Sequence, residues 1–276
     1  MRVAIGVQYD GSGFRGWQTQ GPGVRTVQAC LERALARVAD HPVSVTCAGR
    51  TDAGVHGLGQ VAHFDTGAQR SPRAWVLGGN AHLPADLSLN WACTVPDEFH
   101  ARFSAQARRY RYLILNRAQR AALWRNRAAY CYRPLDAGRM HAAGQMLIGE
   151  HDFSSFRAAE CQARHPVRAL HVLNVFRQGP DGVVLEVEAN AFLHHMVRNI
   201  AGVLMAIGAG ERPVDWAREV LEQRDRTRAG VTAPAEGLYL LAVRYPACFA
   251  LPAAADSMPG FYPNCAKSPV LQGGDG

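Results

Sequence analysis

A loop of small residues around one aspartate is the part of the sequence best suited to chemistry. Residues 49–57 are GRTDAGVHG, and they follow the β-rich run at 42–48. Small residues let a ligand approach the backbone closely, and the neighbouring Arg50 favours the ionised carboxylate of Asp52. An ionised aspartate can act as a nucleophile or a general base without a metal. The residues alone also allow a structural interpretation, in which Asp52 completes a turn and Arg50 is solvated.

A basic segment rich in aromatic residues is the second candidate for function. The chain carries a net charge of +7, yet residues 105–139 contain nine arginines and only one acid, Asp136, so this segment carries +8. Its arginines alternate with aromatic residues in RRYRY at 108–112, and Trp124, Tyr130 and Tyr132 follow. Arginine binds phosphates and aromatic rings stack on bases. The segment therefore suggests a nucleic acid partner, with an ordinary solvated basic face as the alternative.

No pattern in the sequence predicts a metal or a cofactor. The seven cysteines are odd in number and none forms a CxxC pair, which favours reduced thiols over disulfides or a zinc ribbon. The eleven histidines include no HExxH or HxH. His194 and His195 are adjacent, so within a helix they would point about 100° apart and form a poor pair of metal ligands.

One glycine motif resembles a nucleotide-binding signature, but its context argues against that function. Residues 11–16 match GxGxxG directly after a predicted strand. In a dinucleotide site the third glycine lies in the helix that opens next. Here Trp17 and Gln18 follow, then GPG at 21–23, and the helix begins only near Thr26. We expect a tight loop that brings Trp17 and Gln18 to a surface.

The length and composition indicate a folded protein of about two domains. The chain has 276 residues, of which 48% are hydrophobic and 19% charged, which excludes a wholly disordered chain. No run of 18 apolar residues occurs, so we expect no membrane span. The N-terminus lacks the pattern of a signal peptide, and we expect a cytoplasmic protein.

Residues 1–104 predict the element order β-α-β-β-α-β. The predicted elements are a strand at 2–10, a helix capped by Thr26 and running to 38, strands at 42–48 and 59–65, a helix from Ser71 and Pro72 to 82, and a strand at 87–95.

Residues 105–246 predict the same order with one additional helix. The elements are a strand at 110–116, a helix at 135–148, strands at 166–177 and 183–189, helices at 193–207 and 213–223, and a strand at 238–245. We therefore expect an α+β protein of two related halves with mainly antiparallel sheets. Residues 247–276, in which fourteen of thirty residues are Ala, Pro or Gly, predict a tail that is loose at least beyond Asp256.

Six spaced motifs resemble those of the tRNA pseudouridine synthases of the TruA family. The loop GRTDAGVHG resembles the family's catalytic motif. The other motifs are YDGS and GWQ within 9–18, FHARFSA at 99–105 with RRYRY at 108–112, GEHDFSSF at 149–156, NAFLHHMVRNI at 190–200 and AEGLYL at 235–240. The resemblance covers about residues 3–246, and its departures, GPG at 21–23 and the tail, touch no motif.

The resemblance implies roles for four residues. Asp52 corresponds to the catalytic aspartate, which attacks the target nucleotide and permits cleavage of the C1′–N1 bond, after which uracil turns and rejoins through C5. Attack at C6, attack at C1′ and removal of the 2′ proton all remain open. Tyr110 corresponds to the tyrosine that packs on the target base, Arg50 to the arginine that helps displace the base, and Arg198 to the basic partner of the aspartate.

The resemblance also implies the fold and the substrate. It predicts two α+β halves joined in one continuous sheet flanked by helices, with a central active-site cleft. It further implies a homodimer that binds tRNA and modifies uridines 38, 39 and 40 of the anticodon arm without a cofactor. His56, His194 and His195 receive only structural or RNA-contacting roles.

Two other functions remain possible from the residues. A non-catalytic RNA-binding protein with RRM-like halves would lack the expected RNP pattern and would leave Asp52 unexplained. A metal-free hydrolase or lyase that uses Asp52 would leave the arginine and tyrosine segment unexplained.

Overall fold

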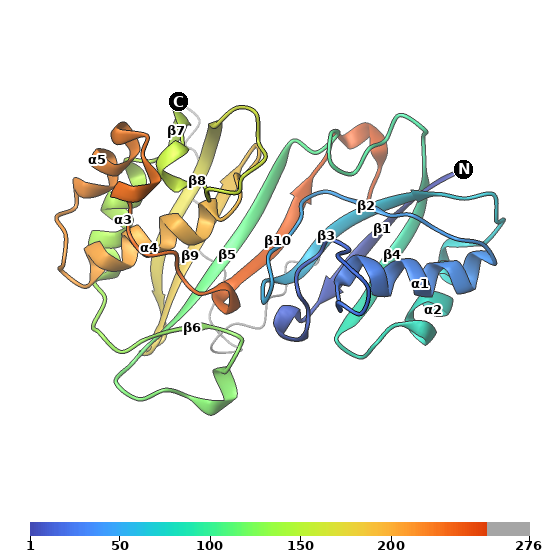
Figure 1. Ribbon diagram of the computed structural model, residues 1–276, viewed down its shortest axis with the longest axis horizontal. Coiled ribbons are helices and arrows are strands. Elements are labelled where there is room, and N and C mark those ends of the chain that lie inside the picture. The colour runs from blue at the N-terminus through green and yellow to red at the C-terminus, as the bar shows by residue number, and fades with distance from the viewer. Residues whose placement is uncertain (253–276) are drawn as a thin grey trace, which may run out of the picture.

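Ten strands form one continuous twisted sheet in the computed structural model, which describes residues 1–252 (Figure 1). The strand order is β4-β1-β3-β10-β5-β9-β8-β7, with β2 beside β3 and β6 beside β5. Within the described residues the β3–β10 and β5–β6 pairs are parallel and the other pairs are antiparallel. The predicted α+β class and the continuous, mainly antiparallel sheet are confirmed.

The first half has the predicted order of elements. It contains β1 (Arg2–Tyr9), α1 (Val27–Ala39), β2 (Thr46–Cys47), β3 (His56–Asp65), α2 (Pro72–His82) and β4 (Leu87–Val95). Both predicted helix starts are confirmed, because the side chains of Thr26 and Ser71 accept hydrogen bonds from backbone N–H groups in the first turns. The strand predicted at 42–48 is only two residues long, since the Val45 N–H donates to the Glu32 carboxylate instead of to a strand.

The second half has the predicted elements and two further short strands. It contains β5 (Ala107–Asn116), β6 (Ala129–Cys131), α3 (Ala137–Gln145), β7 (Gly149–Asp152), β8 (Val167–Gln178), β9 (Gly182–Ala189), α4 (Met196–Gly208), α5 (Trp216–Gln223) and β10 (Leu238–Arg244). Helix α4 starts at Met196 and not at the predicted 193. His195, at φ 62°, adopts a left-handed conformation, so the right-handed helix cannot extend back through it toward residue 193.

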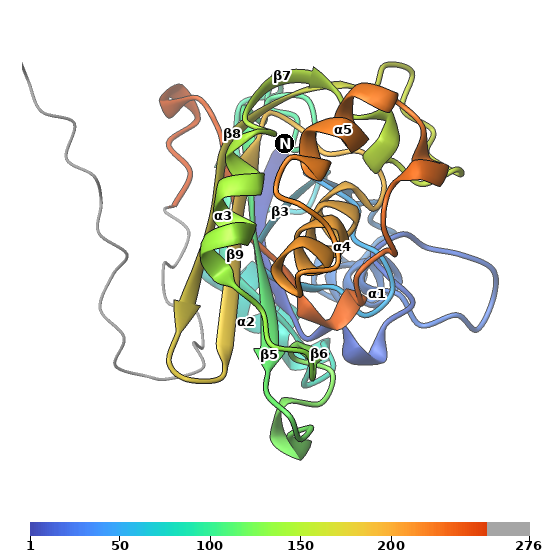
Figure 2. The same cartoon turned by 90° about the vertical axis from the view of Figure 1, so that its left-hand side faces the viewer.

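The two largest of the four hydrophobic clusters within residues 1–252 lie on the same face of the sheet. One core packs β1 and β3 against α1 and α2, and the other packs β5, β8 and β9 against α3 and α4. The cores meet where β3 and β10 pair, because Leu240 of the second core is the register partner of Gly57, which lies against the ring of Tyr9 in the first core. Figure 2 shows the sheet from its side. The pairing leaves the middle strands between the two groups of helices (Figure 1).

The described chain ends in a short turn after β10. Residues 247–252 include a short 3₁₀ turn at Ala247–Phe249, whereas the predicted loose tail beyond Asp256 lies outside the described residues. Strand β10 of the second half pairs with β3 of the first, and the boundary near residue 104 stays a prediction. Within residues 1–252, no helix has the length and apolar character of a membrane span.

Candidate active site

The loop that carries Asp52 packs directly against the glycine motif at 11–16. Gly11 and Gly16 lie against its backbone: an added Cβ would be 2.0 Å from the Val55 carbonyl oxygen and 2.8 Å from that of Thr51. The Trp17 N–H donates to the Thr51 carbonyl at 3.0 Å. Trp17 is buried, so the prediction that this loop brings it to a surface is wrong. The glycines here serve close packing against the aspartate loop.

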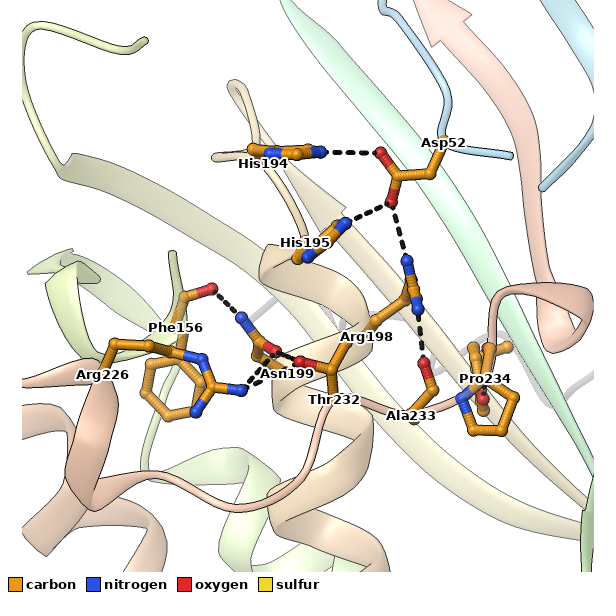
Figure 3. A network of polar contacts seen from close by, with 11 residues as sticks. Asp52, Phe156, His194, His195, Arg198, Asn199, Arg226, Thr232, Ala233 and Pro234 are labelled. Carbon is orange, nitrogen blue, oxygen red and sulfur yellow. Dashed lines mark hydrogen bonds and ion pairs between the residues drawn. The ribbon is translucent and has the colours of Figure 1, made fainter. Parts of the chain in front are cut away.

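Three cationic or potentially cationic groups surround the Asp52 carboxylate (Figure 3). Arg198 Nη1 donates to Oδ2 at 3.0 Å. His194 Nε2 lies 3.1 Å from Oδ1, and His195 Nε2 lies 3.3 Å from Oδ2. The carboxylate remains partly exposed, so it is both paired and accessible to a ligand. Such an arrangement fixes the carboxylate in place and leaves it within reach of a ligand, as nucleophilic or general-base chemistry requires.

Arg198 is fixed by the segment that follows α5. Its Nε donates to the Ala233 carbonyl at 2.8 Å, and the Ala233 N–H donates to the Arg198 carbonyl at 3.1 Å. The segment approaches closely because Gly202, one turn along α4, has no side chain: a Cβ there would lie 1.8 Å from the Val231 carbonyl oxygen. Gly202 therefore allows the backbone at Val231 to pack directly against α4 beside Arg198.

A second polar group lies one residue along α4, at Asn199, which is fully buried (Figure 3). Its Nδ2 donates to the Phe156 carbonyl at 2.7 Å, and its Oδ1 accepts from Thr232 Oγ1 at 2.7 Å. Arg226 Nη2 donates to the same Oδ1 at 3.2 Å and to Thr232 Oγ1 at 2.9 Å. These bonds join α4 to the segment that holds Arg198.

The structure overturns the helical geometry assumed for His194 and His195. Both precede α4, and their ring centroids are 4.0 Å apart instead of pointing in different directions. Burial lowers the pKa of His195, against an opposing effect of Asp52. The contact of these histidines with Asp52 was not predicted from the sequence. Their position directly before the helix that carries Arg198 was the available signal.

Tyr110 lies in the core beneath the site. It is only 7% exposed, and its ring packs edge-on against Phe192 at a centroid distance of 5.1 Å. Burial raises the pKa of its hydroxyl, and Asp52 contributes in the same direction. A Cβ at Gly49 would lie 3.7 Å from that hydroxyl, so Tyr110 reaches the aspartate loop.

Arg108 connects two segments of the site. Its buried guanidinium donates to the carbonyl of Ala48, just before the aspartate loop, at 3.1 Å, and to that of Asn190, just before the histidines, at 2.8 Å. Burial lowers its pKa from the usual value. Arg108 is thus a structural tie and not an exposed phosphate ligand.

Arg50 remains at the surface of the aspartate loop. It is exposed and makes no hydrogen bond or ion pair with another residue in the described part of the chain. The charge partner of Asp52 is Arg198 and not the adjacent Arg50. Of the four predicted site residues, three gather at the site and Arg50 points to solvent, where a substrate could meet it.

Most arginines of the basic segment are already engaged. Arg109 and Arg111 pair with the buried Glu186, and the other engaged arginines of the segment are Arg108, Arg117 (with Asp181), Arg127 (with Asp10), Arg133 (with Glu211) and Arg139. Within residues 1–252, Arg120 and Arg125 are the two of the nine that lack such a partner. Both lie in the loop at 117–128, beside β6 at the lower edge of Figure 1. Acids from outside the segment therefore neutralise much of its charge.

Comparison with known proteins connects this geometry to one activity. A family model described as "tRNA pseudouridine synthase" matches residues 5–104 and 143–246. Proteins named tRNA pseudouridine synthase A are 56% identical in Alcanivorax borkumensis, 58% in Pseudomonas aeruginosa and 59% in Methylococcus capsulatus. Each alignment covers 91% of this chain and 94%, 88% and 92%, respectively, of the relative. An archaeal box H/ACA sRNP Nop10–Cbf5 complex aligns at a TM-score of 0.34 with 10% identity, covering 82% of this chain and 59% of that chain, which is too weak to show a shared fold.

Proposed function

The chain belongs to the family of tRNA pseudouridine synthases and isomerises uridine to pseudouridine in tRNA, and we propose that Asp52 carries out this reaction. The observation that supports the proposal is the Asp52 carboxylate itself, paired with Arg198 at 3.0 Å in a loop of small residues and still accessible. The two other functions considered from the sequence are set aside, because members of this family are isomerases.

The reaction needs the groups that this site contains. The C1′–N1 bond breaks, a C1′–C5 bond forms, C5 loses a proton and N1 gains one, so no oxidant or reductant takes part. An ionised Asp52 can act as nucleophile or base in the first step. Arg198 holds one carboxylate oxygen through a charge-assisted hydrogen bond, which fixes the direction of the other.

Tyr110 and Arg50 complete the proposed site. Tyr110 supports the position of the target base from the core side, because its hydroxyl reaches the aspartate loop. Arg50 is exposed beside Asp52 and helps move the target base out of its stack, a step that costs a few kcal/mol in general. Exposed Arg120 and Arg125 add contacts to tRNA phosphates.

The substrate positions and the assembly are part of the same proposal. The six motifs quoted above lead us to propose uridines 38, 39 and 40 of the anticodon arm as targets. We propose a homodimer in which one tRNA contacts both subunits, acting in the cytoplasm, where tRNA is available. Light scattering should then give twice the mass of one chain, whereas a monomer at working concentration would contradict the dimer.

The decisive experiment replaces the carboxylate of Asp52. Asp52→Asn and Asp52→Ala should bind unmodified tRNA and form no pseudouridine, because an amide is neither the nucleophile nor the base required. Asp97→Asn, at an exposed site, is the matched control and should stay active. Carbodiimide-blocked reverse transcription maps the product, with stops expected at positions 38 to 40. More than a few per cent of wild-type turnover in Asp52→Asn would rule out its proposed role.

A further inference from the structure

The atoms around Asp52 are spaced like the ligands of a transition-metal ion. Asp52, His194 and His195 each present one ligand atom, and the three atoms lie within 4.8 Å of one another. A tetrahedral zinc ion with bonds of about 2.0 to 2.2 Å keeps its ligand atoms roughly 3.3 to 3.6 Å apart. His194 Nε2 lies 3.1 Å from Oδ1 and His195 Nε2 lies 3.3 Å from Oδ2, so the first distance is close to that spacing and the His195 ring must turn toward Oδ1 to join the same ion. Small ring rotations would therefore close an ion between them.

Arg198 leaves one carboxylate oxygen free for such an ion. It donates to Oδ2, whereas Oδ1 faces only His194 among these groups. An ion bound through Oδ1 and the two Nε2 atoms keeps the Arg198 contact and leaves a fourth position toward solvent, because Asp52 and both histidines are partly exposed. The positive charge of Arg198 weakens the attraction between the carboxylate and a metal ion, but Arg198 bonds to Oδ2 and leaves Oδ1 free.

The histidines can supply neutral nitrogen atoms. Coordination requires the Nε2 lone pair, so each neutral ring must carry its proton on Nδ1. Neither Nδ1 has a hydrogen-bond partner among residues 1–252. Metal-binding histidines gain affinity from such partners, and their loss typically costs 10- to 100-fold, so we expect a modest affinity.

We propose that Asp52, His194 and His195 bind a divalent transition-metal ion such as Zn²⁺, and that the bound ion inhibits the enzyme by occupying the Asp52 carboxylate. Two imidazoles and one carboxylate suit Zn²⁺, Cu²⁺ or Ni²⁺, whereas Mg²⁺ and Ca²⁺ prefer oxygen ligands. The inhibition rests on the proposed catalytic role of Asp52, but the binding does not.

Binding can be measured without any activity. The full chain, free of a histidine tag and carrying Cys248→Ser and Cys265→Ser to remove thiol ligands, is titrated with Zn²⁺ against a chromophoric chelator. One ion should bind per chain. His194→Gln, His195→Gln and Asp52→Asn should each weaken binding at least about tenfold, because each removes a direct ligand and the loss of a ligand's hydrogen-bond partner alone typically costs 10- to 100-fold. His82→Gln, at an exposed histidine away from the site, is the control and should bind like the parent.

Inhibition is measured as the single-turnover rate of pseudouridine formation with saturating tRNA. Zn²⁺ should lower the rate of the parent and the His82→Gln control, EDTA should restore it, and Mg²⁺ should not imitate it. Relative to its own metal-free rate, His195→Gln should resist Zn²⁺, which separates binding at the protein from binding to tRNA.

Failure of this proposal differs from failure of the proposed function. Equal zinc affinity in the parent and both histidine variants, or no bound ion at 100-fold excess over the protein, would overturn the metal site, while the Asp52→Asn assay would still stand. A bound ion that leaves the rate unchanged would overturn the inhibition.

Discussion

The ring and the hydroxyl of Tyr110 have separate roles that substitution can distinguish. Tyr110→Phe keeps the buried ring, so tRNA affinity and unfolding should stay near those of the wild type. Tyr110→Ala should weaken tRNA binding by the equivalent of about 1–3 kcal/mol if a base packs there. Because the ring is 7% exposed, the cavity should also cost about 3–5 kcal/mol of stability. Filter binding measures the tRNA affinity and urea unfolding measures the stability. Equal tRNA affinity of the Phe and Ala variants would place Tyr110 outside the site.

A buried histidine away from the site should make stability depend on pH. Burial lowers the pKa of His63 to about 4, and its Nδ1 accepts a hydrogen bond from the Ala101 N–H at 3.1 Å. Since the unfolded chain takes up this proton near pH 6.5, stability should be full above that pH. It should then fall by up to about 3 kcal/mol as the pH drops towards 4. His63→Asn keeps an acceptor without the titration, so its urea midpoint should change less over this window. Identical pH profiles would contradict the assignment.

At the level of residues, the sequence predicted Asp52, Arg198 and Tyr110 as site residues, but it did not predict that His194 and His195, in the motif at 190–200, contact Asp52. Asp52, Arg198 and Tyr110 come together as the motifs indicated. The two histidines were missed because their position depends on the left-handed backbone of His195. A non-glycine residue seldom adopts that conformation, and nothing in the sequence marked it. The assumption that the helix continued through them therefore gave the wrong direction to both rings.

At the level of elements, the fit between α4 and the segment at 231–233 should control the position of Arg198. Gly202→Ala normally favours a helix by about 1 kcal/mol, yet the new Cβ would lie 1.8 Å from a backbone oxygen. The segment must then move away, which breaks the bond from Arg198 Nε to Ala233. We expect a loss of about 1–3 kcal/mol of stability and a lower single-turnover rate. Gly67→Ala, with nothing within 4 Å, is the control, and a Gly202→Ala variant as stable and active as the control would contradict this packing argument.

Long, periodic elements were predictable, and short ones were not. Helices α1 and α2 begin where their caps indicated, because the caps act through local hydrogen bonds. Strands β6 and β7 span three and four residues, too few for a period to show. They exist because neighbouring strands supply partners from distant parts of the chain.

At the level of the whole molecule, the placement of β10 joins the two halves into one sheet. This last strand pairs with β3 and β5 at once, so the loop of Asp52 and the strand of Tyr110 become neighbours. Periodicity predicted the strand, and the family resemblance predicted one continuous sheet, but neither predicted that this strand joins the two halves. Long-range pairing depends on the whole chain and leaves little trace in the local sequence.

Folding brings acidic residues from distant parts of the chain against some arginines of the basic segment and leaves others exposed. The contribution of each arginine to tRNA binding should therefore differ. Arg120 and Arg125 are exposed and unpaired within residues 1–252, whereas Arg117 and Arg127 pair with Asp181 and Asp10. Arg120→Gln and Arg125→Gln should therefore weaken binding of every tRNA similarly and lower the salt dependence by about one contact each. Arg117→Gln and Arg127→Gln are matched controls in the same loop, and they should change binding less because their charge is already neutralised.

Affinity is measured at several salt concentrations, and the rate at saturation should stay nearly unchanged, because none of the four lies at Asp52. If all four variants bind like the wild type across the salt series, the loop is only a solvated face. The tRNA phosphates would then have to lie against other exposed arginines, such as Arg15 and Arg50.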